Sequence, residues 1–279
     1  MSLFLRLIII SLLIVPIGCK KKEVLVDEIK ETSLDLQMID AYNEGMKQLE
    51  LGQSLLAAKK FNEAELFFPQ SKWAPRAALM SAYSYYDFTY YQEAIDEVDR
   101  FLKTYPNNNR KSYAHYIKAM SYYNQIVDEK KDLLEILKAK KYFKIIIKKY
   151  PNTDFAVDSG FKLDLIAEIL ASKEIYLARY YVEREKWIPA INRFKTIIEE
   201  YETTIYVEEA LHRLVELHYK LGLVDEAKKY AAVLGYNYQS SEWYSESYKI
   251  LNKNYKKISK KENLNKQKSI LDKFKNIFK

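Results

Sequence analysis

Small residues recur along the chain at a fixed distance from the point where each apolar, helix-like segment ends. Five pairs share an offset of twelve residues: Ala57 with Pro69, Ala94 with Pro106, Ala139 with Pro151, Ala190 with Glu202, and Ala227 with Gln239. A second set of small or apolar residues precedes these alanines: Gly45, Ala82, Ala119, Ala178 and Val215. Two antiparallel helices pack closely where a residue without bulk lies at their crossing, and proline cannot continue a helix. The pattern therefore predicts helix pairs stacked in series.

This spacing resembles the tetratricopeptide repeat. We expect an all-α fold, an α-solenoid of about five tetratricopeptide-like helix pairs over residues 38–251, in which each pair buries its apolar face against its neighbours. The N-terminal repeats would span residues 38–110 and the C-terminal repeats residues 111–251. The third and fourth alanines lie 51 residues apart, against 37 or 45 elsewhere, and an apolar stripe fills the gap. It predicts an additional helix over residues 154–172 between the third and fourth repeats.

The N-terminus has the organisation of a secretory signal peptide. Arg6 precedes an apolar run that ends at Gly18, too short for the roughly 20 residues that span a bilayer, and the only cysteine of the chain, Cys19, follows directly. Residues 1–18 therefore resemble a bacterial lipoprotein signal with Cys19 as the lipidated first residue, although Pro16 stands where leucine is usual. The alternative is a buried structural cysteine. Residues 19–37 would form a flexible tether.

The positive charge of the chain lies in its C-terminal end. The net charge is +7, yet eleven lysines stand between Lys249 and Lys279 against Glu262 and Asp272, so the rest of the chain is slightly acidic. A nucleic-acid-binding domain carries its basic face on the folded part, so we expect no nucleic-acid partner. Residues 252–279 form a basic lysine-rich tail. Ile270, Leu271, Phe274, Ile277 and Phe278 have the spacing of an amphipathic helix that would lie on an anionic membrane or on a partner; a disordered end is the alternative.

No motif for catalysis or cofactor binding accompanies the repeats. The three histidines are His115, His212 and His218, and the last two are six residues apart, which puts them on different faces of a helix. Zinc-protease, nucleophile-elbow and glycine-rich phosphate-binding motifs are absent from the sequence. Acidic pairs on lysine-rich helices are typical of a solvated face. We therefore expect no catalytic residue, no metal site and no cofactor.

Three stretches of the chain are similar to the BamD family, also called YfiO or ComL, of the outer-membrane β-barrel assembly machinery. They are SKWAPRAALMSAYSYYDFTYYQEAIDEVDRFLKTYP at 71–106, KLDLIAEILASKEIYLARYYVEREKWIPAINRF at 162–194 and EALHRLVELHYKLGLVDEAKKYAAVLGYNY at 209–238. The chain most resembles the alphaproteobacterial branch. It departs from the family at Pro16, at Glu202 and Gln239 where prolines are usual, and in its longer tail.

The resemblance implies a non-enzymatic, lipid-anchored protein on the periplasmic face of the outer membrane. Its expected partners are the periplasmic domains of BamA, other Bam lipoproteins and unfolded outer-membrane β-barrel proteins. For the substrate groove the expected residues are Tyr42, Met46, Leu49, Arg76, Leu79, Tyr83 and Tyr86. For the BamA contact they are Arg193, Asn192 and Arg184. The alternative for the tyrosines is that they only pack between repeats. The alternative for Arg193 is that it is an ordinary surface residue.

Two other functions fit an anchored repeat protein. One is cell-wall maintenance, by binding or cutting peptidoglycan; cutting would need a carboxylic acid with a raised pKa in a closed site. The other is DNA capture during uptake through the basic tail, which predicts binding that falls steeply with salt. Because both share the anchor and the repeat, only the partner separates them from the assembly function.

Overall fold

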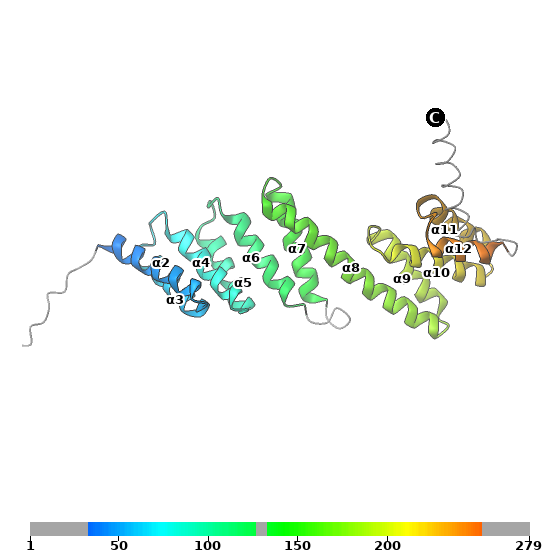
Figure 1. Cartoon of the computed structure of the whole chain (residues 1–279), viewed down its shortest axis with the longest axis horizontal. Coiled ribbons are helices and arrows are strands. Elements are labelled where there is room, and N and C mark those ends of the chain that lie inside the picture. The colour runs from blue at the N-terminus through cyan, green and yellow to red at the C-terminus, as the bar shows by residue number, and fades with distance from the viewer. Residues whose placement is uncertain (1–32, 127–132, 253–279) are drawn as a thin grey trace, which may run out of the picture.

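The computed structural model describes residues 33–126 and 133–252, and within these residues every regular element is an α-helix. The helices are α2 (Leu34–Glu50), α3 (Ser54–Phe67), α4 (Ala74–Asp87), α5 (Tyr91–Thr104), α6 (Lys111–Asn124), α7 (Leu134–Lys149), α8 (Asp154–Glu183), α9 (Trp187–Glu200), α10 (Val207–Lys220), α11 (Val224–Asn237) and α12 (Glu242–Leu251). Consecutive helices pack as antiparallel pairs, and the pairs follow one another along the long axis of the molecule (Figure 1). This is the predicted all-α solenoid of five helix pairs, and α12 packs against the last pair.

The repeating small residues lie where the two helices of each pair meet. The five predicted alanines, from Ala57 to Ala227, are fully buried, and so are Ala82, Ala119, Ala178 and Val215. At Gly45 an added Cβ would lie 2.8 Å from Cε1 of Phe61, so only glycine fits. The second helix of each pair ends two residues before its predicted terminator, for example at Phe67 before Pro69. The fixed offset in the sequence therefore reflects one packing geometry used five times.

The turn between the two helices of a pair also repeats. Gly52, Thr89, Glu185 and Gly222 each stand seven residues after the small residue of the first helix, and all four have positive φ angles of 55° to 79°. Glycine adopts this left-handed conformation without steric cost, whereas a side chain costs roughly 1 kcal/mol or more. In two of the four turns the fold therefore imposes the conformation on a residue that does not favour it.

The additional helix predicted over residues 154–172 is not a separate element. It is the first half of α8, a single 30-residue helix whose second half is the first helix of the fourth pair. The sequence between Ala171 and Tyr176 contains no proline or glycine, so nothing interrupts the backbone hydrogen bonds at the expected boundary. In Figure 1, α8 runs diagonally between the N-terminal and C-terminal repeats.

The loop after α9 folds back onto the N-terminal half of α8. Tyr201 is 8% exposed and belongs to the same core cluster as Phe143 of α7 and Ile166 of α8. Tyr206 packs against both this cluster and the core of the C-terminal repeats. The two halves of the solenoid are therefore joined by a continuous helix and by a second contact beside it.

The predicted signal peptide, Cys19, most of the tether and all but the first residue of the basic tail lie outside the described residues. Within residues 33–126 and 133–252, none of the helices combines the length and hydropathy needed to cross a membrane.

Candidate functional site

An arginine lies against aromatic rings at the N-terminal end of the solenoid. The ring of Tyr42 on α2 packs edge-on against Phe61, with centroids 5.3 Å apart, and lies 6.3 Å from Trp73. The guanidinium carbon of Arg76 is 5.5 Å from the Tyr42 centroid and 5.3 Å from that of Trp73. Two predicted groove residues, Tyr42 and Arg76, are therefore brought together, and a cation over two rings is held by both.

Tyrosines continue this row along α4. Tyr83 and Tyr86 lie with centroids 6.4 Å apart, and Tyr86 lies 5.9 Å from Tyr91. The side-chain amide of Asn124 donates a hydrogen bond of 2.9 Å to the Tyr86 hydroxyl. Burial is the main cause that raises the pKa of Tyr86 above its ordinary value. These rings are half-buried, so part of their surface packs between repeats and part remains accessible.

The aromatic row extends to α6 and to the first turn of α8. The ring of Phe155 lies 5.4 Å from Tyr113 and 5.1 Å from Tyr116. The Tyr116 hydroxyl donates a hydrogen bond of 2.6 Å to Asp158. Burial raises the pKa of Tyr113 to about 12, and burial followed by the bond to Asp158 raises the pKa of Tyr116. Both phenols are neutral at physiological pH, as an ordinary tyrosine is, and burial disfavours their ionised form further.

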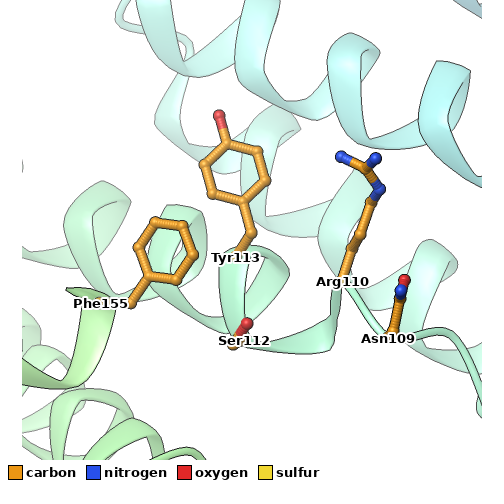
Figure 2. Close-up of a pocket in the computed structure, with 5 residues that line it drawn as sticks. All are labelled: Asn109, Arg110, Ser112, Tyr113 and Phe155. Carbon is orange, nitrogen blue, oxygen red and sulfur yellow. The ribbon is translucent and has the colours of Figure 1, made fainter. Parts of the chain in front are cut away.

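A cavity of about 400 Å³ opens beside these rings, lined by Asn109, Arg110, Ser112, Tyr113 and Phe155. Figure 2 shows the rings of Tyr113 and Phe155 side by side, with Arg110 extending along the other side of Tyr113 toward the preceding helices. Because Asn109 and Arg110 also line a second cavity, of about 330 Å³, the two cavities are adjacent. The second cavity is lined by Lys72, Trp73, Pro75, Arg76, Asn108, Asn109 and Arg110.

This double cavity is basic and contains no carboxylate in its lining. It brings Arg76 and Arg110 together with Lys72. In the part of the chain that the structure describes, neither Arg76 nor Arg110 takes part in an ion pair. Two guanidinium groups without an acidic partner, next to aromatic rings, are suited to bind a carboxylate attached to an aromatic residue.

One predicted groove residue is corrected by the structure. Leu79 is 2% exposed and packs with Ala114 and Ile117 of α6, so it cannot line a groove. Leu79 lies on the side of α4 that faces α6, the first helix of the next pair, and its side chain fills the space between these two helices. Met46 and Leu49 on α2 are partly exposed.

Sequence reasoning missed Trp73, Arg110, Tyr113 and Phe155. A signal for one of them was present: Tyr113 stands six residues before Ala119, as Arg76 stands six residues before Ala82. Extending the groove positions from the first two repeats to the third would have identified Tyr113. Arg110 and Trp73 come from the loops between pairs, where the repeat pattern makes no prediction.

A separate cavity lies in the C-terminal repeats. It has a volume of about 310 Å³ and is lined by Tyr181, Ile188, Pro189, Asn192, Arg193 and Thr196. Nη1 of Arg193 on α9 donates hydrogen bonds of 3.0 and 3.3 Å to the carboxylate of Glu174 on α8. The Glu174 side chain is 14% exposed, whereas that of Arg193 is 42% exposed. Arg193 is thus held at one end and presents its remaining donors to solvent.

The third predicted contact residue, Arg184, lies elsewhere. It follows the last residue of α8, and its guanidinium carbon is 3.6 Å from the centroid of Tyr180. It is not among the residues that line the cavity of Arg193. The structure therefore brings Asn192 and Arg193 together and places Arg184 outside that cavity.

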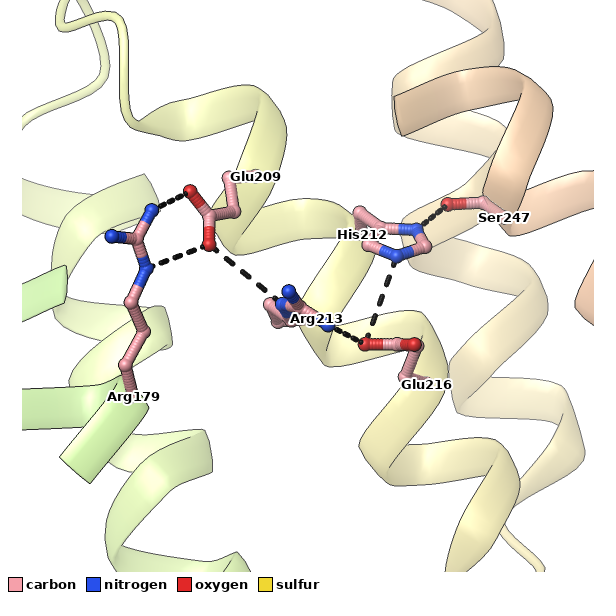
Figure 3. A network of polar contacts seen from close by, with 6 residues as sticks. All are labelled: Arg179, Glu209, His212, Arg213, Glu216 and Ser247. Carbon is pink, nitrogen blue, oxygen red and sulfur yellow. Dashed lines mark hydrogen bonds and ion pairs between the residues drawn. The ribbon is translucent and has the colours of Figure 1, made fainter. Parts of the chain in front are cut away.

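A polar network fixes the C-terminal helices relative to one another. The guanidinium group of Arg179 on α8 donates hydrogen bonds to the carboxylate of Glu209 on α10. On α10, Arg213 donates a hydrogen bond of 2.6 Å to the carboxylate of Glu216 (Figure 3). Nδ1 of His212 lies 2.9 Å from the hydroxyl of Ser247 on α12. Burial is the main cause that lowers the pKa of His212. The network spans α8, α10 and α12, and its buried members are paired, so it has the character of a structural connection.

His218 is buried as well, and its Nδ1 lies 2.7 Å from the backbone oxygen of Leu214. Across residues 33–126 and 133–252, no group of three or more histidine, cysteine, aspartate or glutamate side chains is arranged to hold a metal ion.

Comparison with known proteins places this chain among outer membrane lipoproteins. The family model YfiO, described as "Outer membrane lipoprotein", matches residues 34–234. The outer membrane protein assembly factor BamD of Rickettsia prowazekii is 40% identical over 238 residues, which cover 85% of this chain and 92% of that protein. The protein of the same name from Caulobacter vibrioides is 39% identical over 237 residues, covering 85% and 76%.

Among solved structures, a thermophilic TPR protein of Thermus thermophilus is 17% identical, with a TM-score of 0.34, and the match covers 77% of this chain and 98% of that one. The matched residues 34–234 of the family model contain every helix from α2 to α10, together with most of α11. The chain therefore belongs to the YfiO family of outer membrane lipoproteins, whose curated relatives carry the name BamD.

Proposed function

We propose that this protein is a non-enzymatic scaffold and substrate receptor in outer membrane protein assembly. In this proposal Cys19 carries the lipid that anchors the chain to the periplasmic face of the outer membrane. The N-terminal groove receives the C-terminal segment of unfolded β-barrel proteins, and the C-terminal repeats bind the periplasmic domains of BamA. The names of the curated relatives as assembly factors support this assignment.

The observation that carries the proposal is the double cavity with its two arginines. Aromatic rings offer apolar area to an extended peptide, and their hydroxyl groups can reach its backbone. A cavity of about 400 Å³ between Tyr113, Phe155 and Arg110 is large enough for one aromatic side chain. Arg110 and Arg76 would then bind the terminal carboxylate with charge-assisted hydrogen bonds. A peptide that ends in an aromatic residue meets both requirements at once.

The cavity of Arg193 supports the partner contact. Ile188 beside it is 62% exposed, and Arg193 retains free donor groups on its exposed side. Arginine is one of the residue types enriched among the residues that contribute most to binding at protein interfaces. Other Bam lipoproteins are also proposed as partners, because the chain belongs to the YfiO family.

The test is a fluorescence-anisotropy titration of the full chain in detergent with a labelled ten-residue peptide that ends in phenylalanine. Amidation of the peptide C-terminus, or Arg110→Gln, is expected to weaken binding about tenfold, because each removes a charged hydrogen bond. Arg184→Gln is the matched control, since Arg184 lies outside both N-terminal cavities. Equal affinity for the free and the amidated peptide would refute the carboxylate site.

The partner contact is tested separately by co-purification. Arg193→Glu is expected to reduce recovery of BamA, with Lys228→Glu on α11 as the control of equal charge change, because Lys228 is 63% exposed and lies outside the cavity of Arg193. Unchanged recovery in Arg193→Glu would remove the C-terminal cavity from the proposed interface while leaving the peptide groove standing.

A further inference from the structure

The outer face of the N-terminal half of α8 is apolar and exposed. Val157, Phe161 and Leu165 stand at i, i+4 and i+8 and are 62%, 65% and 48% exposed. The opposite side of the same helix carries Ile166 and Leu170, which are buried against α6 and α7. Four-residue spacing puts the three exposed side chains in one row. Large apolar side chains grouped on a surface mark an interaction site more often than single ones do.

The loop between α9 and α10 adds a fourth apolar side chain to this row. The backbone N–H of Ile205 donates a hydrogen bond of 3.2 Å to Oε1 of Glu168, one turn beyond Leu165. Ile205 is 77% exposed. We call Val157, Phe161, Leu165 and Ile205 together the α8 outer face.

Acidic side chains border the α8 outer face. Asp154, Asp164 and Glu168 lie on the same side of the helix, by the 100° spacing of successive residues. Lys162 lies on a different side, and its Nζ is 5.0 Å from the ring centroid of Tyr123 on α6. The α8 outer face is thus apolar in the middle and negative at its margins, and an anionic membrane surface would be repelled by it.

One segment of this chain has the complementary pattern. Residues 269–279 carry apolar side chains at 270, 271, 274, 277 and 278, and Lys273 and Lys275 flank this stripe on its two sides. We propose that residues 269–279 form an amphipathic helix that docks on the α8 outer face of the same molecule. The apolar stripes would then cover each other, and the lysines would face Asp154, Asp164 and Glu168.

The length of the chain allows this docking. The described part ends at Asn252, after α12, which packs on α10. The sixteen residues from 253 to 268 can span at most roughly 55 Å. The whole of α8, with 30 residues, is about 45 Å long, and its second half packs against α9. A fully extended linker is therefore longer than the whole of α8, so the length of the chain does not exclude this docking.

The test places the photo-reactive residue p-benzoylphenylalanine at position 161 of the full chain, reconstituted in liposomes with anionic lipids. Crosslinked peptides are identified by mass spectrometry. A crosslink to residues 269–279 is expected, and it should be lost in Phe274→Asp. The same probe at position 66, where Leu66 on α3 is 74% exposed, is the control and should not reach the tail. Mixing isotope-labelled and unlabelled protein distinguishes the same molecule from a second copy.

The charge component is tested with Asp164→Lys, which is expected to lower the crosslink yield about two- to threefold at low salt. Asp225→Lys is the matched control, because the Asp225 side chain is 91% exposed and lies on α11. Crosslinks only to lipid, only to a second copy, or to no part of the tail would each overturn the proposal. Equal yields in the two charge variants would also contradict it.

Discussion

Substitution of Gly45 by alanine tests whether the repeated small residues set the packing of each helix pair. A Cβ at position 45 would lie 2.8 and 2.9 Å from Cε1 and Cδ1 of Phe61, whose side chain is fully buried. Because the ring is enclosed, either the ring shifts and disturbs its neighbours or the helices separate, at a cost of about 1 to 3 kcal/mol for overpacking. Alanine in a helix interior also gains about 1 kcal/mol over glycine. The net effect of Gly45→Ala is therefore a loss of up to about 2 kcal/mol.

Gly160→Ala is the matched control for this experiment. Gly160 lies in the interior of α8, and an added Cβ there meets no atom within 4 Å. The Gly160→Ala substitution makes the same change in helix propensity without overpacking, so the free energy of unfolding should rise by about 1 kcal/mol. The two variants should differ in unfolding free energy by about 1 to 3 kcal/mol. Each kcal/mol corresponds to a shift of roughly 2 to 4 °C in Tm. Thermal unfolding followed by circular dichroism measures this difference.

The same pair of variants connects packing with the groove. Because the Phe61 ring contacts Tyr42 at 5.3 Å, displacement of Phe61 should also move Tyr42 and weaken the proposed peptide binding in Gly45→Ala alone. Equal Tm shifts in the two variants would refute the packing argument. A shifted Tm with unchanged peptide affinity would refute only the connection with Tyr42.

Three further predictions follow from individual contacts. Arg193→Glu should lower the unfolding free energy by about 1 to 2 kcal/mol in urea titrations, since it puts a second carboxylate beside Glu174, and Arg193→Lys should recover most of this loss. Burial lowers the pKa of His212 in the folded state, so the unfolded chain binds more protons below about pH 6.5, and stability should fall as the pH drops from there toward the folded pKa. His212→Gln should flatten this dependence, which has a limiting slope of about 1.4 kcal/mol per pH unit for one proton; an unchanged slope would exclude His212 as its cause. Thr89→Gly should raise Tm, because Thr89 has a φ of 64° and β-branched residues disfavour that conformation by roughly 1 kcal/mol, while Thr203→Gly, outside that turn position, should not.

The repeat could be predicted because its determinants are local. A small residue at the helix crossing and a terminator twelve residues later are both visible in the sequence, and the structure places Ala94 at the crossing and ends α5 just before Pro106. The continuity of α8 could not be predicted from the same rule. The rule gives the distance between repeats but not the conformation of the inserted residues, and these contain no residue that would end the helix.

The candidate site was predicted in part for a similar reason. Tyr42 and Arg76 stand at positions that the repeat geometry turns toward one surface, and they meet in the structure. Leu79 was assigned to the same surface, because helical spacing alone does not reveal that the neighbouring helix α6 covers it. Arg110 was missed because loops between repeats have no periodicity from which to derive its direction.

The two candidate sites are connected by one helix. Phe155 in the first turn of α8 lines the N-terminal cavity. Farther along α8, Tyr181 lines the C-terminal cavity, and Glu174 accepts a hydrogen bond from Arg193 of that cavity. Nineteen residues separate Phe155 from Glu174, which corresponds to about 29 Å along the helix axis. The helix has no proline between these points, and Tyr201 and Tyr206 pack beside it as a second support. A peptide bound at Phe155 and a partner bound at Arg193 would therefore be held at a fixed separation and orientation, so the solenoid positions its two proposed ligands relative to each other without a hinge between them.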